Sequence, residues 1–154
     1  LKAYGDTERR VWVADSFQGL PPPDAANYPA DKGLKFHTHK ELAVTEEQVK
    51  ANFAKYGLLD DQVVFLPGWF KDTLPTAPIE SLALLRLDGD MYESTIVALD
   101  ALYHKLSPGG FAIVDDYGDV EACRAAVTDF RSRENIDETI HDIDGTGVFW
   151  QKDA

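Results

Sequence analysis

Short apolar runs that alternate with helical patterns constrain this chain more than any other feature. Four such runs end in a polar, acidic or proline residue, and they span Val11–Asp15, Gln62–Pro67, Leu82–Asp88 and Gly110–Asp115. This alternation predicts an α/β fold with a mostly parallel sheet that is covered on both faces. Near the C-terminus, Thr139–Ile143 and Gly147–Gln151 flank an Asp-Gly-Thr turn and predict an antiparallel hairpin.

Three stretches of helical periodicity lie between the expected strands. The first begins at a Thr45–Gln48 capping box and ends near Gly57; the second spans about Glu93 to Leu106; the third starts near Asp119. We expect Pro108-Gly109-Gly110 to stop the second helix, and Cys123 to be a small core residue of the third.

Residues 18–42 lack periodicity and include three consecutive prolines. A loop of this length is usually functional, so it is predicted to be a lid. Within it, Asn27, Tyr28 and Asp31 are expected to face a bound acceptor.

The whole chain, residues 1–154, is predicted to form a single domain. Its formal net charge of −12 argues against nucleic acid or an anionic membrane surface as partner, and it permits metal ions and sugars. A single cysteine and the lack of a long apolar run favour a cytoplasmic protein.

Acidic residues follow three of the expected strands, at Asp15, Asp88 and the pair Asp115-Asp116. Ligands of open α/β sheets bind at the carboxyl ends of the strands, although an Asp at this place also often caps the next helix. Three clustered carboxylates repel one another unless a cation or protons neutralise them, and their oxygens suit Mg²⁺. Asp90 is a candidate general base beside such an ion, with helix capping as the alternative.

The first two strand ends also carry features of a nucleoside site. An acid such as Asp15 can bind the hydroxyls of a ribose, and Pro67-Gly68-Trp69-Phe70 is an aromatic platform suited to adenine. The alternative is that Trp69 and Phe70 are core residues of a short helix. Arg86, inside an apolar strand, needs a carboxylate or carbonyl partner and is interpreted as structural.

Several segments together resemble the macrocin O-methyltransferase family. They are DSFQGLP, LPGWFKDTLPTAPIESLALLRLDGDMYEST, GGFAIVDDY and CRAAVTDFR, and the likeness runs from about Val11 to the C-terminus. The resemblance, which is strongest to the novobiocin type, implies a Rossmann-like class I methyltransferase that uses S-adenosylmethionine and Mg²⁺ to methylate a sugar hydroxyl of an antibiotic.

The resemblance also implies roles for individual residues. Asp88, Asp115 and Asp116 would bind the metal, and Asp90 would be the general base. The cofactor would be bound by residues after the first two strands, namely Asp15 at the ribose, with Ser16, Gly68 and Trp69 beside the nucleoside.

The family's first strand, with its Gly-rich cofactor turn, is not found in this sequence. We expect a gap in the sheet at that place, between the strands at Val11–Asp15 and Leu82–Asp88. Exposed strand edges at the gap predict a homo-oligomer or a rearranged sheet.

Three other functions explain part of the acidic pattern. A Mg²⁺-dependent phosphohydrolase of the haloacid dehalogenase type would use the LDGD motif, but that motif normally ends the first strand. A glycosyltransferase DxD motif explains Asp88 and Asp90 but leaves Asp115 and Asp116 without a role. An inactive fragment that retains the fold is the third alternative.

Overall fold

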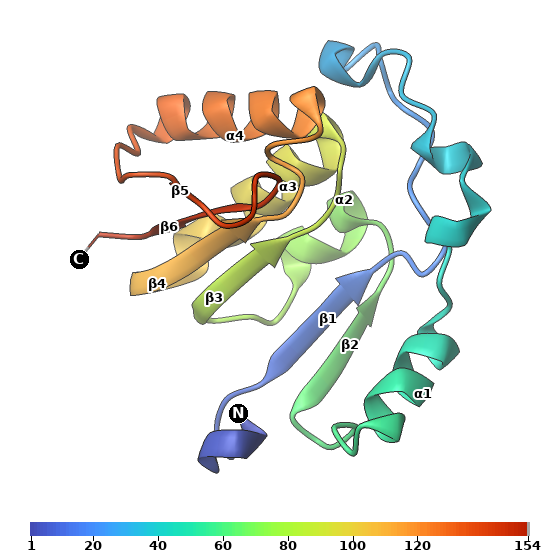
Figure 1. Ribbon diagram of the computed structural model, residues 1–154, viewed down its shortest axis with the longest axis vertical. Helices are drawn as coiled ribbons and strands as arrows, with labels where there is room; N and C mark the ends of the chain where they lie inside the picture. The colour runs from blue at the N-terminus through green and yellow to red at the C-terminus, as the bar shows by residue number, and fades with distance from the viewer. Residues whose placement is uncertain (154) are drawn as a thin grey trace. The chain divides into compact units, whose positions relative to one another are not determined.

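A computed structural model describes residues 1–153. These residues form two compact units: residues 1–22 with 35–73, and residues 23–34 with the chain from 74 onward. The principal elements (Figure 1) are β1 Val11–Asp15, α1 Glu46–Lys55, β2 Val63–Pro67, α2 Phe70–Thr73, β3 Leu82–Leu87, α3 Tyr92–Leu102, β4 Leu106–Val114, α4 Glu121–Glu134, β5 His141–Asp142 and β6 Val148–Gln151.

The first unit contains a parallel pair of strands, β1 and β2, and helix α1. The register places Val11 opposite Val63 and Asp15 opposite Pro67, so the two strands end at the same level. Helix α1 has the predicted capping box at Thr45, because the side chain and backbone of Thr45 exchange hydrogen bonds with those of Gln48. The two strands and the helix therefore confirm the sequence prediction for this unit.

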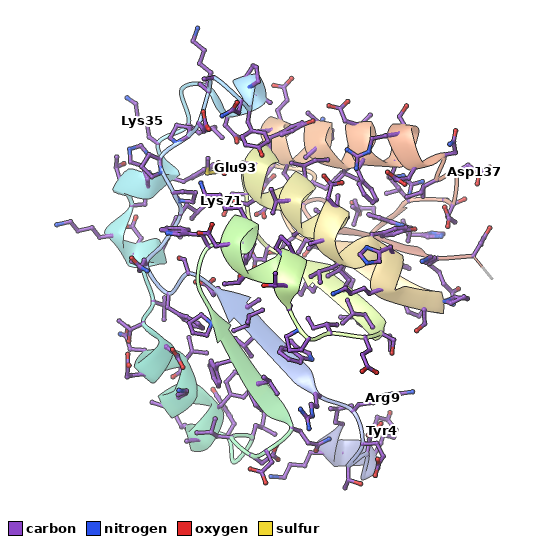
Figure 2. The ribbon with its side chains drawn as sticks, turned by 180° about the vertical axis from the view of Figure 1, so that it is seen from behind. Tyr4, Arg9, Lys35, Lys71, Glu93 and Asp137 are labelled. Carbon is purple, nitrogen blue, oxygen red and sulfur yellow. The ribbon has the colours of Figure 1, made fainter. Side chains whose placement is uncertain are left out.

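The second unit contains a four-stranded sheet in the order β3-β4-β6-β5. Strands β3 and β4 are parallel, and β6 runs antiparallel to both β4 and β5, which confirms the predicted terminal hairpin. Helices α3 and α4 cover one face of this sheet (Figure 2). The core lies between them and includes Leu85, Leu87, Leu99, Ala112, Val114, Val127, Phe130 and Trp150.

Helix α3 is shorter than predicted and β4 is longer. The helix ends at Leu102, a 3₁₀ turn covers Tyr103–Lys105, and β4 begins at Leu106. Leu106 pairs with Leu82 of β3, and Gly109 and Gly110 exchange backbone hydrogen bonds with Lys152. The Pro-Gly-Gly segment therefore belongs to the strand, and the helix stops before it because Leu106 is already paired in the sheet.

The strands form two separate sheets. Within residues 1–153, no hydrogen-bonded ladder joins the β1–β2 pair to the four-stranded sheet. This agrees with the interruption predicted next to β1 and β3, and the chain has not rearranged its own strands to close it. No helix in the same range is long and apolar enough to cross a membrane.

The expected lid, residues 18–42, is divided between the two units and contains short 3₁₀ turns at Pro29–Asp31, Phe36–Thr38 and Lys40–Leu42. In the second unit, the side chain of Asp31 is completely buried. Its two carboxylate oxygens accept the backbone N–H groups of Tyr92, at 2.7 Å, and Glu93, at 2.9 Å.

Asp31 thus caps the first turn of α3, whose own N-cap residue, Met91, makes no side-chain capping bond. A carboxylate at this position satisfies free backbone donors and interacts favourably with the helix dipole. The expectation that Asp31 faces an acceptor is wrong, because both of its oxygens are used inside the fold. Tyr28, from the same segment, packs its ring against Tyr92 at 6.1 Å between centroids.

We predict that Asp31→Ala lowers the free energy of unfolding by about 1.5–3 kcal/mol, the usual contribution of a hydrogen bond to a charged group. Urea denaturation measures the loss, and hydrogen exchange should become faster at the amides of Tyr92 and Glu93. Asp137→Asn, at an exposed acid, is the matched control. A variant as stable as the wild type would show that this cap contributes little.

Candidate metal centre and cofactor-binding residues

Strand alternation places Asp88 and Asp115 side by side. In the parallel pair β3–β4, Arg86 lies opposite Ile113 and Leu87 opposite Val114, so Asp88 and Asp115 are the next residues on neighbouring strands. The ladder continues to this level, since the N–H of Asp115 donates to the carbonyl of Leu87 at 2.9 Å. Two like charges in such an arrangement are destabilising unless they are neutralised.

Arg86 neutralises both acids. Because side chains on a strand alternate, Arg86 lies on the same face as Asp88. Its Nη1 donates to Asp88 Oδ2 at 2.8 Å, and its Nη2 donates to Asp115 Oδ1 at 2.7 Å. The prediction that Arg86 has carboxylate partners is confirmed.

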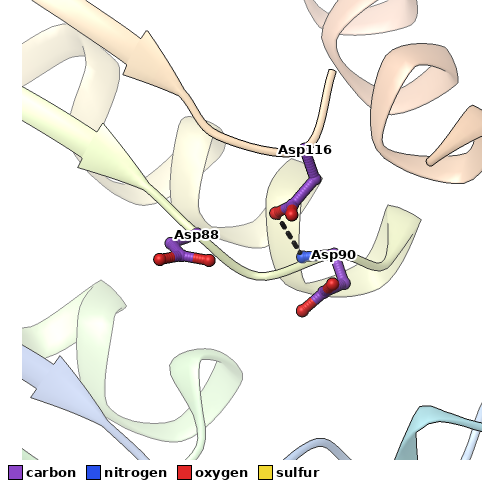
Figure 3. Close-up of side chains that lie close together, drawn as sticks. All are labelled: Asp88, Asp90 and Asp116. Atoms are coloured by element: carbon purple, nitrogen blue, oxygen red, sulfur yellow. Dashed lines mark hydrogen bonds between the residues drawn. The ribbon is translucent and has the colours of Figure 1, made fainter. Parts of the chain in front are cut away.

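Asp116 follows Asp115 but joins a different group. Oxygen atoms of Asp88, Asp90 and Asp116, one from each residue, all lie within 4.8 Å of one another (Figure 3). Asp116 Oδ2 accepts the backbone N–H of Asp90 at 3.1 Å. All four acids thus belong to one cluster, in which Asp88 is shared by the Arg86 pairs and by the group of three.

The backbone at Asp90 makes this arrangement possible. Asp90 has a φ of 55°, in the left-handed region that few residues other than glycine adopt. The neighbouring Gly89 is not among the residues with positive φ. This conformation lets the chain turn from β3 into α3 while the Asp90 N–H reaches Asp116.

Burial and mutual repulsion disfavour the charged forms of these acids. Burial raises the pKa of Asp90 to about 6, and the charges of Asp116, Asp88 and Asp115 contribute in the same direction. Burial also raises the pKa of Asp116, although the N–H of Asp90 acts against this shift. A divalent cation would relieve this repulsion. Clustered carboxylate oxygens are also the ligands that a hard divalent cation prefers.

The turn after β4 is held from two sides. The N–H of Gly118 donates to the carbonyl of Thr146 in the hairpin at 2.7 Å. From α4, Arg124 donates to the carbonyls of Tyr117, at 3.0 Å, and Gly118, at 2.8 Å. The sequence analysis did not identify Gly118 or Arg124 as residues that support the site. The one available signal was a glycine shortly after the Asp115-Asp116 pair.

In the first unit, Asp15 and Ser16 organise the turn that follows β1. Asp15 Oδ1 accepts the N–H of Phe17 at 2.6 Å, and Phe17 has a φ of 56°. Ser16 is buried; its hydroxyl donates to the carbonyl of Gly19 at 2.7 Å and accepts the N–H of Gln18 at 3.0 Å. The Asp15 side chain therefore stabilises its own turn and does not cap a following helix.

Gly68 and Trp69 lie at the end of β2, next to that turn. The N–H of Gly68 donates to the carbonyl of Asp15 at 2.9 Å, which joins the ends of the two strands. Gly68 has a φ of 137°, and a Cβ there would lie 2.6 Å from Thr73 Cγ2. Trp69 is only partly buried and immediately precedes the short helix α2 at Phe70–Thr73.

Cys123 is buried, as predicted for a core residue. Burial raises the pKa of its thiol to about 11, and Thr95 Oγ1 donates to its sulfur at 3.6 Å. A thiol with such a pKa is protonated at neutral pH and is a poor nucleophile.

The strands, helices and their connections form an α/β fold of the methyltransferase type. The chain belongs to the macrocin O-methyltransferase (TylF) family, whose sequence profile matches residues 1–152. Membership of this family favours a methyltransferase over the phosphohydrolase and glycosyltransferase alternatives.

Three curated relatives are O-methyltransferases. A tetracenomycin rhamnosyl 4'-O-methyltransferase from Streptomyces olivaceus is 60% identical over 155 residues, which cover 100% of this chain and 59% of the relative. Mycinamicin III 3''-O-methyltransferase from Micromonospora griseorubida is 52% identical over 157 residues, covering 100% of this chain and 61% of the relative. Demethyldecarbamoylnovobiocin O-methyltransferase from Streptomyces niveus is 52% identical over 153 residues, which cover 99% of this chain and 58% of the relative.

Solved structures agree with the family. The O-methyltransferase NovP superimposes with a TM-score of 0.97 at 51% identity, and the match covers 100% of this chain and 64% of NovP. The calicheamicin methyltransferase CalS11 shares the fold, with a TM-score of 0.70 at 20% identity, and the match covers 96% of this chain and 62% of CalS11. The chain thus spans about three-fifths of the length of the curated relatives it matches.

We predict that Gly118→Ala destabilises the second unit. A Cβ at position 118 would lie 2.2 Å from the carbonyl oxygen of Gly145 and 2.8 Å from Thr146 Cα, and neither backbone atom can move without shifting the hairpin. The expected loss in the free energy of unfolding is about 1–3 kcal/mol, measured by urea denaturation.

Gly147→Ala in the same hairpin is the control, since a Cβ at position 147 finds no atom closer than 3.5 Å and the φ of Gly147 is not positive. Equal stability of the two variants would contradict the steric argument.

Proposed function

We propose that this chain carries the catalytic residues of an S-adenosylmethionine-dependent, Mg²⁺-assisted O-methyltransferase that acts on a sugar hydroxyl of a glycosylated natural product. Membership of the macrocin O-methyltransferase family supports the reaction class. The single observation that carries the metal-assisted chemistry is the cluster of carboxylates at the ends of β3 and β4.

Asp88, Asp115 and Asp116 are the proposed ligands of the metal. Asp88 and Asp115 lie on neighbouring strands and are joined through Arg86, and oxygens of Asp88 and Asp116 lie within 4.8 Å of each other. A Mg²⁺ ion bound there would lower the pKa of a sugar hydroxyl and orient it for attack.

Asp90 is the proposed general base. Methyl transfer to a hydroxyl needs a group that takes the proton as the oxygen attacks, and that group must lie beside the reacting oxygen. Asp90 is half-buried next to the proposed ligands, and its backbone N–H is fixed by Asp116. Its carboxylate is thereby positioned at the cluster without being paired to Arg86.

The residues at the ends of β1 and β2 are proposed to bind the cofactor. The Asp15 carboxylate is suited to accept hydrogen bonds from the ribose hydroxyls, and the partly exposed ring of Trp69 is suited to contact the adenine. Gly68 allows close backbone approach at the strand end, and Ser16 maintains the turn from which Asp15 projects.

The acceptor is proposed to be a small-molecule glycoside, in line with the sugar-bearing compounds named for the relatives. The single cysteine supports a cytoplasmic location. The net charge of −12 argues against nucleic acid or an anionic membrane as a partner. Methyl transfer from S-adenosylmethionine should be assayed with the rhamnosylated tetracenomycin, mycinamicin III and demethyldecarbamoylnovobiocin. If none of these three compounds were methylated, the result would contradict the proposed function.

We predict that Asp115→Asn and Asp116→Asn each weaken Mg²⁺ binding by roughly 10–100-fold or more, since even residues that only support metal ligands contribute this much. Isothermal titration calorimetry of this chain with MgCl₂ measures the affinity. Asp119→Asn, at an exposed acid near the cluster, is the matched control. If Asp90→Asn weakened binding and Asp115→Asn did not, the third ligand would be Asp90.

A second prediction separates the base from the ligands. Asp90→Asn should lower turnover by about 10²–10⁴-fold, the scale of a lost general base, because the amide cannot take the proton. Mg²⁺ affinity measured by calorimetry should stay close to that of the wild type. Wild-type turnover in this variant would reduce Asp90 to a structural residue of the turn into α3.

A further inference from the structure

We propose that Arg86 competes with the divalent cation for Asp88 and Asp115 and thereby sets the affinity of the metal centre. This inference rests on the proposed metal site. Arg86 would then be more than a structural partner: it is a positioning residue that holds two proposed ligands in place when no ion is bound and lowers their affinity for one.

The first argument is the occupancy of the carboxylate oxygens. The two terminal nitrogens of a single guanidinium donate to Asp88 Oδ2 at 2.8 Å and to Asp115 Oδ1 at 2.7 Å. Each of these bonds uses one of the two oxygens of an acid that is proposed to bind the ion. An ion that binds through these same oxygens displaces the guanidinium from them.

The second argument is charge. Asp88, Asp90, Asp115 and Asp116 gather four carboxylates around one guanidinium. Arg86 forms ion pairs with two of these four acids, Asp88 and Asp115. Removing it would leave the cluster more negative, and a more negative cluster attracts Mg²⁺ more strongly.

The third argument is exposure. The side chains of Arg86, Asp88 and Asp115 are 48%, 50% and 44% exposed, so both ion pairs are in contact with solvent. Exposed ion pairs contribute little to stability, and they can be exchanged without exposing a buried charge. Displacement of Arg86 by a cation is therefore an accessible step, because the cation then neutralises the two acids in its place.

The proposal and a purely structural role predict opposite signs. If Arg86 competes with the ion, Arg86→Met raises Mg²⁺ affinity, by roughly fivefold, the factor that corresponds to one Coulombic contact in water. If Arg86 only holds Asp88 and Asp115 in position, its removal lets the two acids separate, and Mg²⁺ affinity falls.

Isothermal titration calorimetry of the whole chain with MgCl₂ tests this. We expect Arg86→Met to bind Mg²⁺ more tightly than the wild type and Arg86→Lys to be intermediate, since an ammonium retains the charge but lacks the fork that reaches both acids. Arg133→Met is the matched control, because Arg133 also pairs with two acids of this unit, Asp100 and Glu134, away from the cluster. Urea denaturation establishes that each variant is folded, and Arg86→Gln serves if the methionine variant is not.

Unchanged or weaker binding in the folded Arg86 variant, with measurable binding by the wild type, would overturn this inference and leave the proposed metal site intact. An absence of Mg²⁺ binding by the wild type would overturn the metal site itself and this inference with it. An equal gain in affinity for Arg133→Met would show that the effect is one of net charge, and it too would overturn the role of Arg86.

Discussion

The juxtaposition of like charges at the ends of β3 and β4 is the constraint on which the second unit depends. The register of a parallel pair leaves Asp88 and Asp115 no freedom to avoid each other, because each is the residue that follows its strand. The guanidinium of Arg86 reduces this repulsion by donating a hydrogen bond to each of the two carboxylates. Asp116, one residue further, turns away and accepts the N–H of Asp90. The loops on both sides are thus shaped by acids that must be near one another.

Such a cluster needs a rigid frame, since repelling groups would otherwise move apart. Arg124 and the hairpin carbonyl of Thr146 hold the turn that carries Asp116. Asp31 holds the start of α3, two residues after Asp90. The cost of gathering the acids is therefore offset by many ordinary hydrogen bonds to backbone atoms around them, none of which involves the acids' own charges.

Local signals in the sequence predicted local structure well. Apolar runs located the strands, and the Thr45–Gln48 pair located the start of α1, because both depend on neighbours in the chain. The end of α3 was misplaced, since it is decided by the pairing of Leu106 with Leu82 across the sheet. The positions of the acids at the strand ends were predictable, but the separation of Asp115 from Asp116 required strand alternation and register together. The cap from Asp31 had no local signal.

The remote cap on α3 has a consequence for how this family can vary. Asp31 precedes Tyr92 by 61 positions in the sequence, yet its carboxylate accepts the backbone N–H of Tyr92. Recombination that took residues 23–34 from one relative and α3 from another would combine a capping segment and a helix that had not evolved together. We expect the two segments to be inherited together, so that new specificities assembled from existing enzymes would exchange them as a pair, although they are distant in the gene.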